Sequence, residues 1–211
     1  MELLQPWYWR SLPLEHRTGS EVFAALFLKA GAIATLLESP SPSSVGKTAG
    51  EAAGTSQFKL ARYSICAGTP RILNGSPAVW TPSLGNILPF LRQLLRRGAA
   101  EDIFSPPVQH LPFTGGWLGW LGYDLAWEIE RLPKLNADPL PFPVAYWYEP
   151  ECFAVLDRQE QILWLAATEE KQLDLLQSQL ESIPPCPPLR RGGSTITNPL
   201  PRFCTSQTEY E

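Results

Sequence analysis

The chain has 211 residues, of which 44% are hydrophobic and 18% charged, and its net charge is −4. This length and composition are typical of a globular protein with a core of its own, and the acidic balance gives no electrostatic basis for binding nucleic acid or acidic membranes. No apolar run approaches the roughly 20 residues of a membrane-spanning helix, so we expect no membrane partner.

The N-terminus and the cysteines indicate a cytoplasmic protein. Residues 1–6 lack the basic start and apolar run of a signal peptide. The cysteines form no CxxC pair and have no histidine at zinc-ligand spacing; they are Cys66, Cys152, Cys186 and Cys204. We expect reduced thiols, two of them buried in strands, and neither a metal site nor a cofactor in this chain. His16 and His110 are far apart in sequence, and we expect both at the surface or at element boundaries.

Hydrophobic periodicity and turn residues predict strands and helices over most of the chain. In chain order, strands are expected at 7–12, 32–38, 62–67, 71–73, 78–81, 115–122, 144–148, 152–157 and 161–167, and helices at 19–30, 84–97, 123–130 and about 169–183. Thr18 and Glu21 occupy the capping-box positions at the start of the first helix. The strand at 32–38 is short and apolar, which favours a buried position. Residues 39–57 are rich in Ser, Gly, Pro, Ala and Thr, and we expect a long, mobile loop there.

Turn chemistry predicts the fold class. Asn74-Gly75 is a tight-hairpin signal, and residues 157–160 make a turn between two strands, so pairing should be antiparallel. The expected fold is α+β, with layered, largely antiparallel β-sheets and packed helices. We expect one domain over 1–183, a Pro/Gly-rich linker over 184–201, and the start of a further element over 202–211 that is cut off before it forms.

One polar cluster is a candidate binding site. Glu38 and Ser39 end one predicted strand, and Arg62, Tyr63 and Ser64 begin the next. If the two strands are neighbours, a carboxylate, hydroxyls and a phenol converge at one sheet edge, which suits a small zwitterion with an apolar part. The alternative is a purely structural strand end in which Arg62 pairs with Glu38. The acids Glu149 and Glu151 flank a proline at a turn, and we expect them to be solvated.

A glycine-rich stretch over residues 112–124, PFTGGWLGWLGYD, carries the clearest signature. Its glycines predict close backbone approach at a buried junction between layers. The stretch resembles the PFxGGxxGxxGYD signature in the N-terminal domain of component I of anthranilate synthase and of aminodeoxychorismate synthase. Three further pieces resemble that family in the same order, at 36–39, 61–65 and 153–157, and residues 203–211 are similar to the opening of its chorismate-binding domain.

The resemblance implies a function for the complete protein. The family enzyme aminates chorismate with ammonia from a glutamine amidotransferase subunit, using Mg²⁺, on the tryptophan or folate route. Its catalytic and metal-binding residues belong to the C-terminal chorismate-binding domain, so the resemblance assigns no catalytic residue here. It implies that the N-terminal domain forms one half of a tryptophan pocket. The candidate contacts are Leu37, Glu38, Ser39, Tyr63 and Ser64.

Three hypotheses remain open from the sequence. The first is an N-terminal part of such a component I, inactive alone, with the missing C-terminal domain and the amidotransferase as partners. The second is a stand-alone module that binds an aromatic amino acid or a glutaminase partner. The third is an unrelated α+β enzyme with a site at the edge formed by Glu38 and Arg62. Under the first hypothesis, an uncovered apolar face makes the isolated chain prone to self-association.

Overall fold

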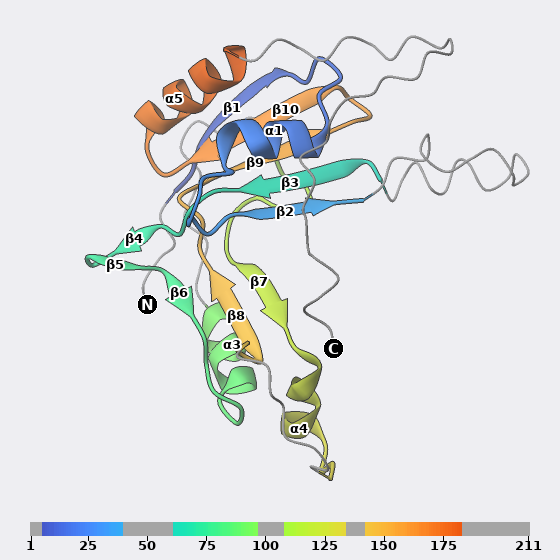
Figure 1. The fold of residues 1–211 in the computed structure, drawn as a ribbon, viewed down its shortest axis with the longest axis vertical. Helices are drawn as coiled ribbons and strands as arrows, with labels where there is room; N and C mark the ends of the chain where they lie inside the picture. The colour runs from blue at the N-terminus through green and yellow to red at the C-terminus, as the bar shows by residue number, and fades with distance from the viewer. Residues whose placement is uncertain (1–5, 40–60, 97–107, 134–141, 183–211) are drawn as a thin grey trace, which may run out of the picture.

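The computed structural model describes residues 6–39, 61–96, 108–133 and 142–182, which fold into two antiparallel sheets, a small hairpin and four helices (Figure 1). Every strand pair is antiparallel, so the predicted α+β class with layered antiparallel sheets is confirmed. The predicted loop at 39–57 beyond its first residue, the linker at 184–201 and the element at 202–211 lie outside the described residues. No helix in the described ranges is long and apolar enough to cross a membrane.

A five-stranded sheet in the order β1-β10-β9-β3-β2 forms the centre of the fold. Its strands are β1 (Tyr8–Pro13), β2 (Thr35–Glu38), β3 (Tyr63–Ala67), β9 (Cys152–Asp157) and β10 (Ile162–Ala167). Ala154 and Leu156 on β9 point toward helices α1 (Gly19–Leu26) and α5 (Glu170–Glu181), whereas Phe153 and Val155 point to the other face. Because both faces are covered, the two central strands are almost wholly buried.

Aromatic side chains fill the core on the second face. Trp7 and Phe113 meet the ring of Phe153 edge to face, each with ring centroids 4.8 Å apart. Tyr148 of the second sheet packs into the same cluster. That sheet has the order β6-β8-β7, with β6 (Val79–Trp80), β7 (Leu118–Leu121) and β8 (Ala145–Tyr148). Helix α3 (Ile87–Leu95) covers its far side, where Ile87 packs with Ala145 and Trp147 of β8.

The glycine-rich stretch brings two backbones close together, as predicted, at the paired strands β7 and β8, but most of it is exposed or half-buried rather than buried and its strand is shorter than expected. Residues 115–117 precede β7, and Gly115 and Gly116 have φ of 120° and 109°, a region that favours glycine. A Cβ on Gly119 would overlap the carbonyl oxygen of Tyr146 on β8 and lie 2.8 Å from the Cα of Trp147. After β7 the chain makes a 3-10 turn, Tyr123–Leu125, and helix α4 (Ala126–Ile129).

Several element boundaries differ from the sequence prediction. Helix α1 ends at Leu26 rather than near residue 30, and α3 begins at Ile87 because the turn before it is capped by the Glu128 carboxylate, which accepts from the amides of Ile87 and Leu88 at 2.9 Å. Asn74-Gly75 makes a hairpin turn, as predicted, but it joins β4 (Ile72–Leu73) to β5 (Ser76–Pro77) rather than to β6. The strand expected at 32–38 is an edge strand, so it is only half-buried.

A buried ion pair lies where the chain crosses between the two sheets. Arg71 donates through Nη1 to Glu149 Oε1 at 2.9 Å, and these residues are 3% and 2% exposed. The guanidinium carbon of Arg71 also lies 4.6 Å from the centre of the Trp7 ring. The expectation that Glu149 is solvated is therefore wrong, because its partner lies 78 residues away and the local sequence does not indicate it.

Candidate functional site: a pocket at the edge of β2 and β3

A pocket of about 550 Å³ opens at the sheet edge formed by β2 and β3. It is lined by Leu36, Leu37, Glu38, Ser39, Tyr63, Ile65 and Pro112. Four of the five candidate residues from the sequence are in this set, and only Ser64 is not. Leucine, isoleucine, proline and tyrosine surfaces with a few polar groups are typical of small-molecule sites.

Strand register divides the candidate residues between two faces of the sheet. Leu37 pairs with Ile65, and Glu38 pairs with Ser64, so alternate pairs point to opposite sides. Tyr63 lies two residues from Ile65 and shares its face. The side chain of Leu37 is 49% exposed because β2 is the outermost strand. The apolar face of the edge is therefore available to a ligand.

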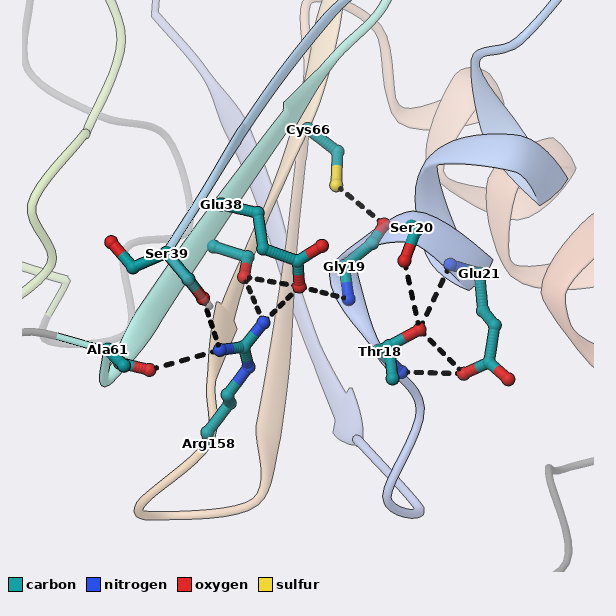
Figure 2. Close-up of polar contacts among 10 residues, drawn as sticks. Thr18, Gly19, Ser20, Glu21, Glu38, Ser39, Ala61, Cys66 and Arg158 are labelled. Carbon is teal, nitrogen blue, oxygen red and sulfur yellow. Dashed lines mark hydrogen bonds and ion pairs between the residues drawn. The ribbon is translucent and has the colours of Figure 1, made fainter. Parts of the chain in front are cut away.

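Glu38 and Ser64 face helix α1 instead. The Glu38 Oε1 atom accepts from the backbone amide of Gly19 at 3.0 Å and from the Ser64 hydroxyl at 3.2 Å (Figure 2). A Cβ on Gly19 would lie 2.6 Å from that oxygen, so the close approach needs a glycine. The amide belongs to the first residue of α1, where unpaired N–H groups favour a carboxylate. The helix itself begins with the predicted capping box, in which Glu21 N donates to Thr18 Oγ1 at 3.2 Å and Thr18 N donates to Glu21 Oε2 at 2.7 Å.

Arg158, in the turn between β9 and β10, completes this network. Its Nη2 group forms an ion pair with Glu38 and donates to Ser64 Oγ at 2.9 Å. Its Nη1 group donates to the carbonyl oxygens of Ser39 and Ala61 at 3.1 and 3.2 Å. Figure 2 shows the guanidinium between these groups, which come from the ends of two neighbouring strands.

A second ion pair flanks the pocket on β3. Arg62 donates to the buried carboxylate of Asp157 through Nε at 3.0 Å and through Nη2 at 2.6 Å. The predicted alternative, an ion pair between Arg62 and Glu38, is wrong, because each takes its partner from the β9–β10 hairpin. The Arg62 guanidinium carbon also lies 4.8 Å from the centre of the Tyr63 ring. Burial raises the pKa of the Tyr63 hydroxyl, so it stays a neutral hydrogen-bonding group at physiological pH.

Four residues of the site are not among the candidates named from the sequence: Leu36, Ile65, Pro112 and Arg158. Arg158 is 94 or more residues from its side-chain partners Glu38 and Ser64, and Pro112 reaches the pocket from the segment before the glycine-rich stretch. The sequence pattern places Arg158 only in a turn. The available signal is that a charged side chain directly after a buried strand can bind groups on a neighbouring strand.

The described residues do not offer a metal site. No three His, Cys, Asp or Glu side chains meet within the described ranges. Cys66 and Cys152 are free thiols whose pKa is raised to about 12 by burial, so neither forms a thiolate near neutral pH. The residues present do not fit Mg²⁺, and no chemical step is assigned to a metal here. His16 and His110 are both exposed, as predicted.

Known proteins resemble this chain, one of them along almost all of its length. No family model matches it. An anthranilate synthase component I-like protein of Synechocystis sp. (strain ATCC 27184 / PCC 6803 / Kazusa) is 48% identical over 214 residues, which cover 99% of this chain and 39% of that protein. The chain thus spans about two fifths of the length of this relative.

Shorter matches involve named enzymes. Anthranilate synthase component 1 of Thermus thermophilus is 39% identical over 74 residues, 34% of this chain and 16% of that protein. Aminodeoxychorismate synthase component 1 of Bacillus subtilis is 36% identical over 75 residues, 34% of this chain and 16% of that protein. The crystal structure of anthranilate synthase component I from Streptococcus pneumoniae aligns with a TM-score of 0.41 at 24% identity, over 59% of this chain and 30% of that one.

Proposed function

We propose that this chain, which is homologous to the N-terminal portion of anthranilate synthase component I and aminodeoxychorismate synthase component I, is the regulatory and structural part of a chorismate-aminating synthase. The observation that carries the proposal is the 48% identity over 99% of the chain, against only 39% of the relative. In this proposal the chain serves tryptophan or folate biosynthesis and does not aminate chorismate on its own.

The proposal assigns the edge pocket to the aromatic part of an amino acid such as tryptophan. Leu37, Ile65 and Pro112 offer apolar surface, and Tyr63 offers an aromatic ring. Glu38 does not supply a free carboxylate for the ammonium group, because Arg158 and the Gly19 amide occupy it. The charged end of the ligand therefore needs partners beyond Glu38 and the other described residues that line the pocket. In this proposal they come from the C-terminal domain, so the isolated chain should bind tryptophan weakly.

Two protein partners follow from the proposal. A C-terminal chorismate-binding domain would supply the catalytic residues and Mg²⁺, and a glutamine amidotransferase would supply ammonia. The chain exposes apolar side chains suited to such a contact on and after β7: Trp120, Leu121, Tyr123, Ile129 and Phe142 are between 45% and 89% exposed.

Reconstitution tests the enzymatic part of the proposal. The purified chain is assayed with chorismate, ammonia and Mg²⁺, alone and mixed with the part of the Synechocystis relative that lies beyond the match. We expect no turnover by the chain alone and product from the mixture. Anthranilate fluorescence identifies one product, and a lyase-coupled assay for aminobenzoate identifies the other. Turnover of chorismate by the chain alone would refute the proposal.

Ligand titration tests the pocket. We expect L-tryptophan to shift the methyl signals of Leu37 and Ile65 in a saturable way in two-dimensional NMR spectra. Leu37→Asp should abolish the shift of the Ile65 methyl signals, because it places a charge on the apolar wall. Leu175→Asp, at a position on α5 that is 63% exposed, is the control and should leave them unchanged. Equal effects of both variants would count against the pocket.

The alternative function is a stand-alone module that binds an aromatic amino acid or a partner. It is favoured by one observation, that described residues of this chain form the pocket without a second domain. The two functions differ in how tryptophan affinity responds to the remaining region of the relative. A gain of affinity in the mixture supports the synthase part, and an unchanged affinity supports the stand-alone module.

A further inference from the structure

We infer that Arg158 is a positioning residue of the edge pocket, which sets ligand affinity by fixing the backbone at the end of β2 without contacting the ligand. The inference rests on the proposed ligand role of the pocket. Arg158 is not among the described residues that line the pocket, yet its guanidinium bonds to Glu38 and Ser39, which do line it. Nothing in the glycine-rich stretch or the strand pattern assigns it this role.

The strand ladder alone does not hold the pocket backbone. The pairing of β2 with β3 ends at Glu38 and Ser64, so Ser39 lies beyond the last rung. Its carbonyl oxygen accepts from Arg158 Nη1 at 3.1 Å, and the same nitrogen donates to the carbonyl of Ala61 at 3.2 Å. Arg158, from the turn between β9 and β10, therefore joins Ser39, which follows β2, to Ala61, which precedes β3.

The Nη2 nitrogen of Arg158 binds the groups of β2 and β3 that face helix α1. Nη2 binds the Glu38 carboxylate and the Ser64 hydroxyl, and Glu38 in turn accepts from the Gly19 amide. Because neighbouring residues on β2 point to opposite faces, fixing Glu38 on the helix side also fixes the direction of Leu37 on the pocket side. The role of Glu38 is thus structural, through Arg158 and α1, rather than a contact with a ligand ammonium group.

An arginine is needed for this geometry. The planar guanidinium presents two nitrogens to four acceptors that lie on or next to β2 and β3, whereas a lysine ammonium is a single point charge. Lysine at position 158 keeps the charge opposite Glu38 but cannot reach both carbonyl groups and the carboxylate together. Arg158→Lys therefore distinguishes the effect of the positive charge from the effect of the planar guanidinium geometry.

The first experiment measures tryptophan affinity by NMR titration of the whole 211-residue chain and its variants. We expect Arg158→Gln to weaken binding at least fivefold and Arg158→Lys to recover part of that loss. Arg10→Gln is the matched control, because Arg10 is similarly exposed, at 27% against 20%, and pairs with Asp174 on α5. It should change affinity less than twofold. An unchanged affinity in Arg158→Gln overturns the inference.

A ligand comparison tests whether Glu38 acts through Arg158. Indole-3-propionate lacks the ammonium group of tryptophan but keeps its ring and carboxylate. We expect Glu38→Gln to weaken both ligands by the same factor, and the double variant Glu38→Gln/Arg158→Gln to bind no more weakly than Arg158→Gln. A loss confined to tryptophan would show a direct ammonium contact, and effects of the two variants that multiply would show that Glu38 acts independently of Arg158. Either outcome would overturn the positioning role of Glu38.

Backbone exchange separates this inference from the proposed function. Hydrogen exchange is followed without ligand at low temperature, where Arg158→Gln and Arg158→Lys are checked to be folded by circular dichroism. We expect the amides of Leu37 and Ser64 to exchange at least tenfold faster in Arg158→Gln, with no change on α5. If wild type binds no tryptophan, the proposed ligand fails while exchange still decides whether Arg158 fixes the edge. Unchanged exchange overturns the inference.

Discussion

Asp157 is a fully buried carboxylate that is held in the ionised form. Burial alone would raise its pKa, but hydrogen bonds from Arg62 and from the backbone amides of Glu160 and Gln159 outweigh this and hold the pKa below its usual range. In the unfolded chain the pKa of an Asp side chain is about 3.9. The stabilisation by Asp157 is therefore complete above that pH and is lost as the pH falls through the lower pKa of the folded protein.

We predict that Asp157→Asn lowers the free energy of unfolding by about 3 kcal/mol at pH 7, because it removes the buried carboxylate of this ion pair and leaves Arg62 only the longer contact with Glu160 at 3.7 Å. Urea denaturation between pH 2 and pH 8 measures this. The difference from wild type should shrink below about pH 4, where the unfolded wild-type chain takes up a proton on Asp157 before the folded protein does. Asp174→Asn, in an exposed pair with Arg10, is the control and should cost less than about 1 kcal/mol. A difference between Asp157→Asn and wild type that is constant down to pH 2 would contradict the assignment.

At the scale of elements, β7 depends on a glycine. A side chain at Gly119 would overlap the backbone of Tyr146 on the paired strand β8. We predict that Gly119→Ala lowers the free energy of unfolding by about 3 kcal/mol, at the upper end of the usual cost of overpacking, because the overlap is with backbone rather than with a flexible side chain. Leu121→Ala in the same strand should cost less than about 1 kcal/mol, since that leucine is 47% exposed. Thermal denaturation compares the two, and equal stability of Gly119→Ala and wild type would show that β7 can shift.

Local sequence was sufficient for elements whose signals are local. The capping box of α1, the Asn74-Gly75 turn and the β9–β10 hairpin all form as predicted. A predicted element boundary was wrong where a residue distant in sequence sets it, as Glu128 does by capping the start of α3. Strand adjacency placed four candidate residues around one pocket, but the ion-pair partners of Glu38, Arg62 and Glu149 depend on tertiary contacts that no short pattern encodes.

At the scale of the molecule, the exposed apolar side chains concentrate in one region. Half of the large hydrophobic side chains that are exposed in the described residues lie between Trp120 and Phe142. Exposed apolar side chains in this number favour self-association in water. We predict that the isolated chain forms oligomers at high concentration and that Tyr123→Lys/Ile129→Lys shifts it toward monomer.

Light scattering over a concentration series measures this association. Leu28→Lys/Leu175→Lys changes two leucines that are each 63% exposed on the helix side of the five-stranded sheet, and this control should leave the oligomers in place. A monodisperse wild-type monomer at high concentration would show that the region between Trp120 and Phe142 does not drive association.

The chain passes from β8 to β9 through only Glu149, Pro150 and Glu151. Glu149 is paired to Arg71 at this crossing, and Pro150 is fully buried. A single cut here would not separate the two sheets, because β1, β2 and β3 of the five-stranded sheet precede β6 to β8 and only β9 and β10 follow them. It would remove the central strand β9 from the five-stranded sheet and expose the aromatic core around Phe153. Dissection into smaller folded units therefore has no natural seam between the two sheets.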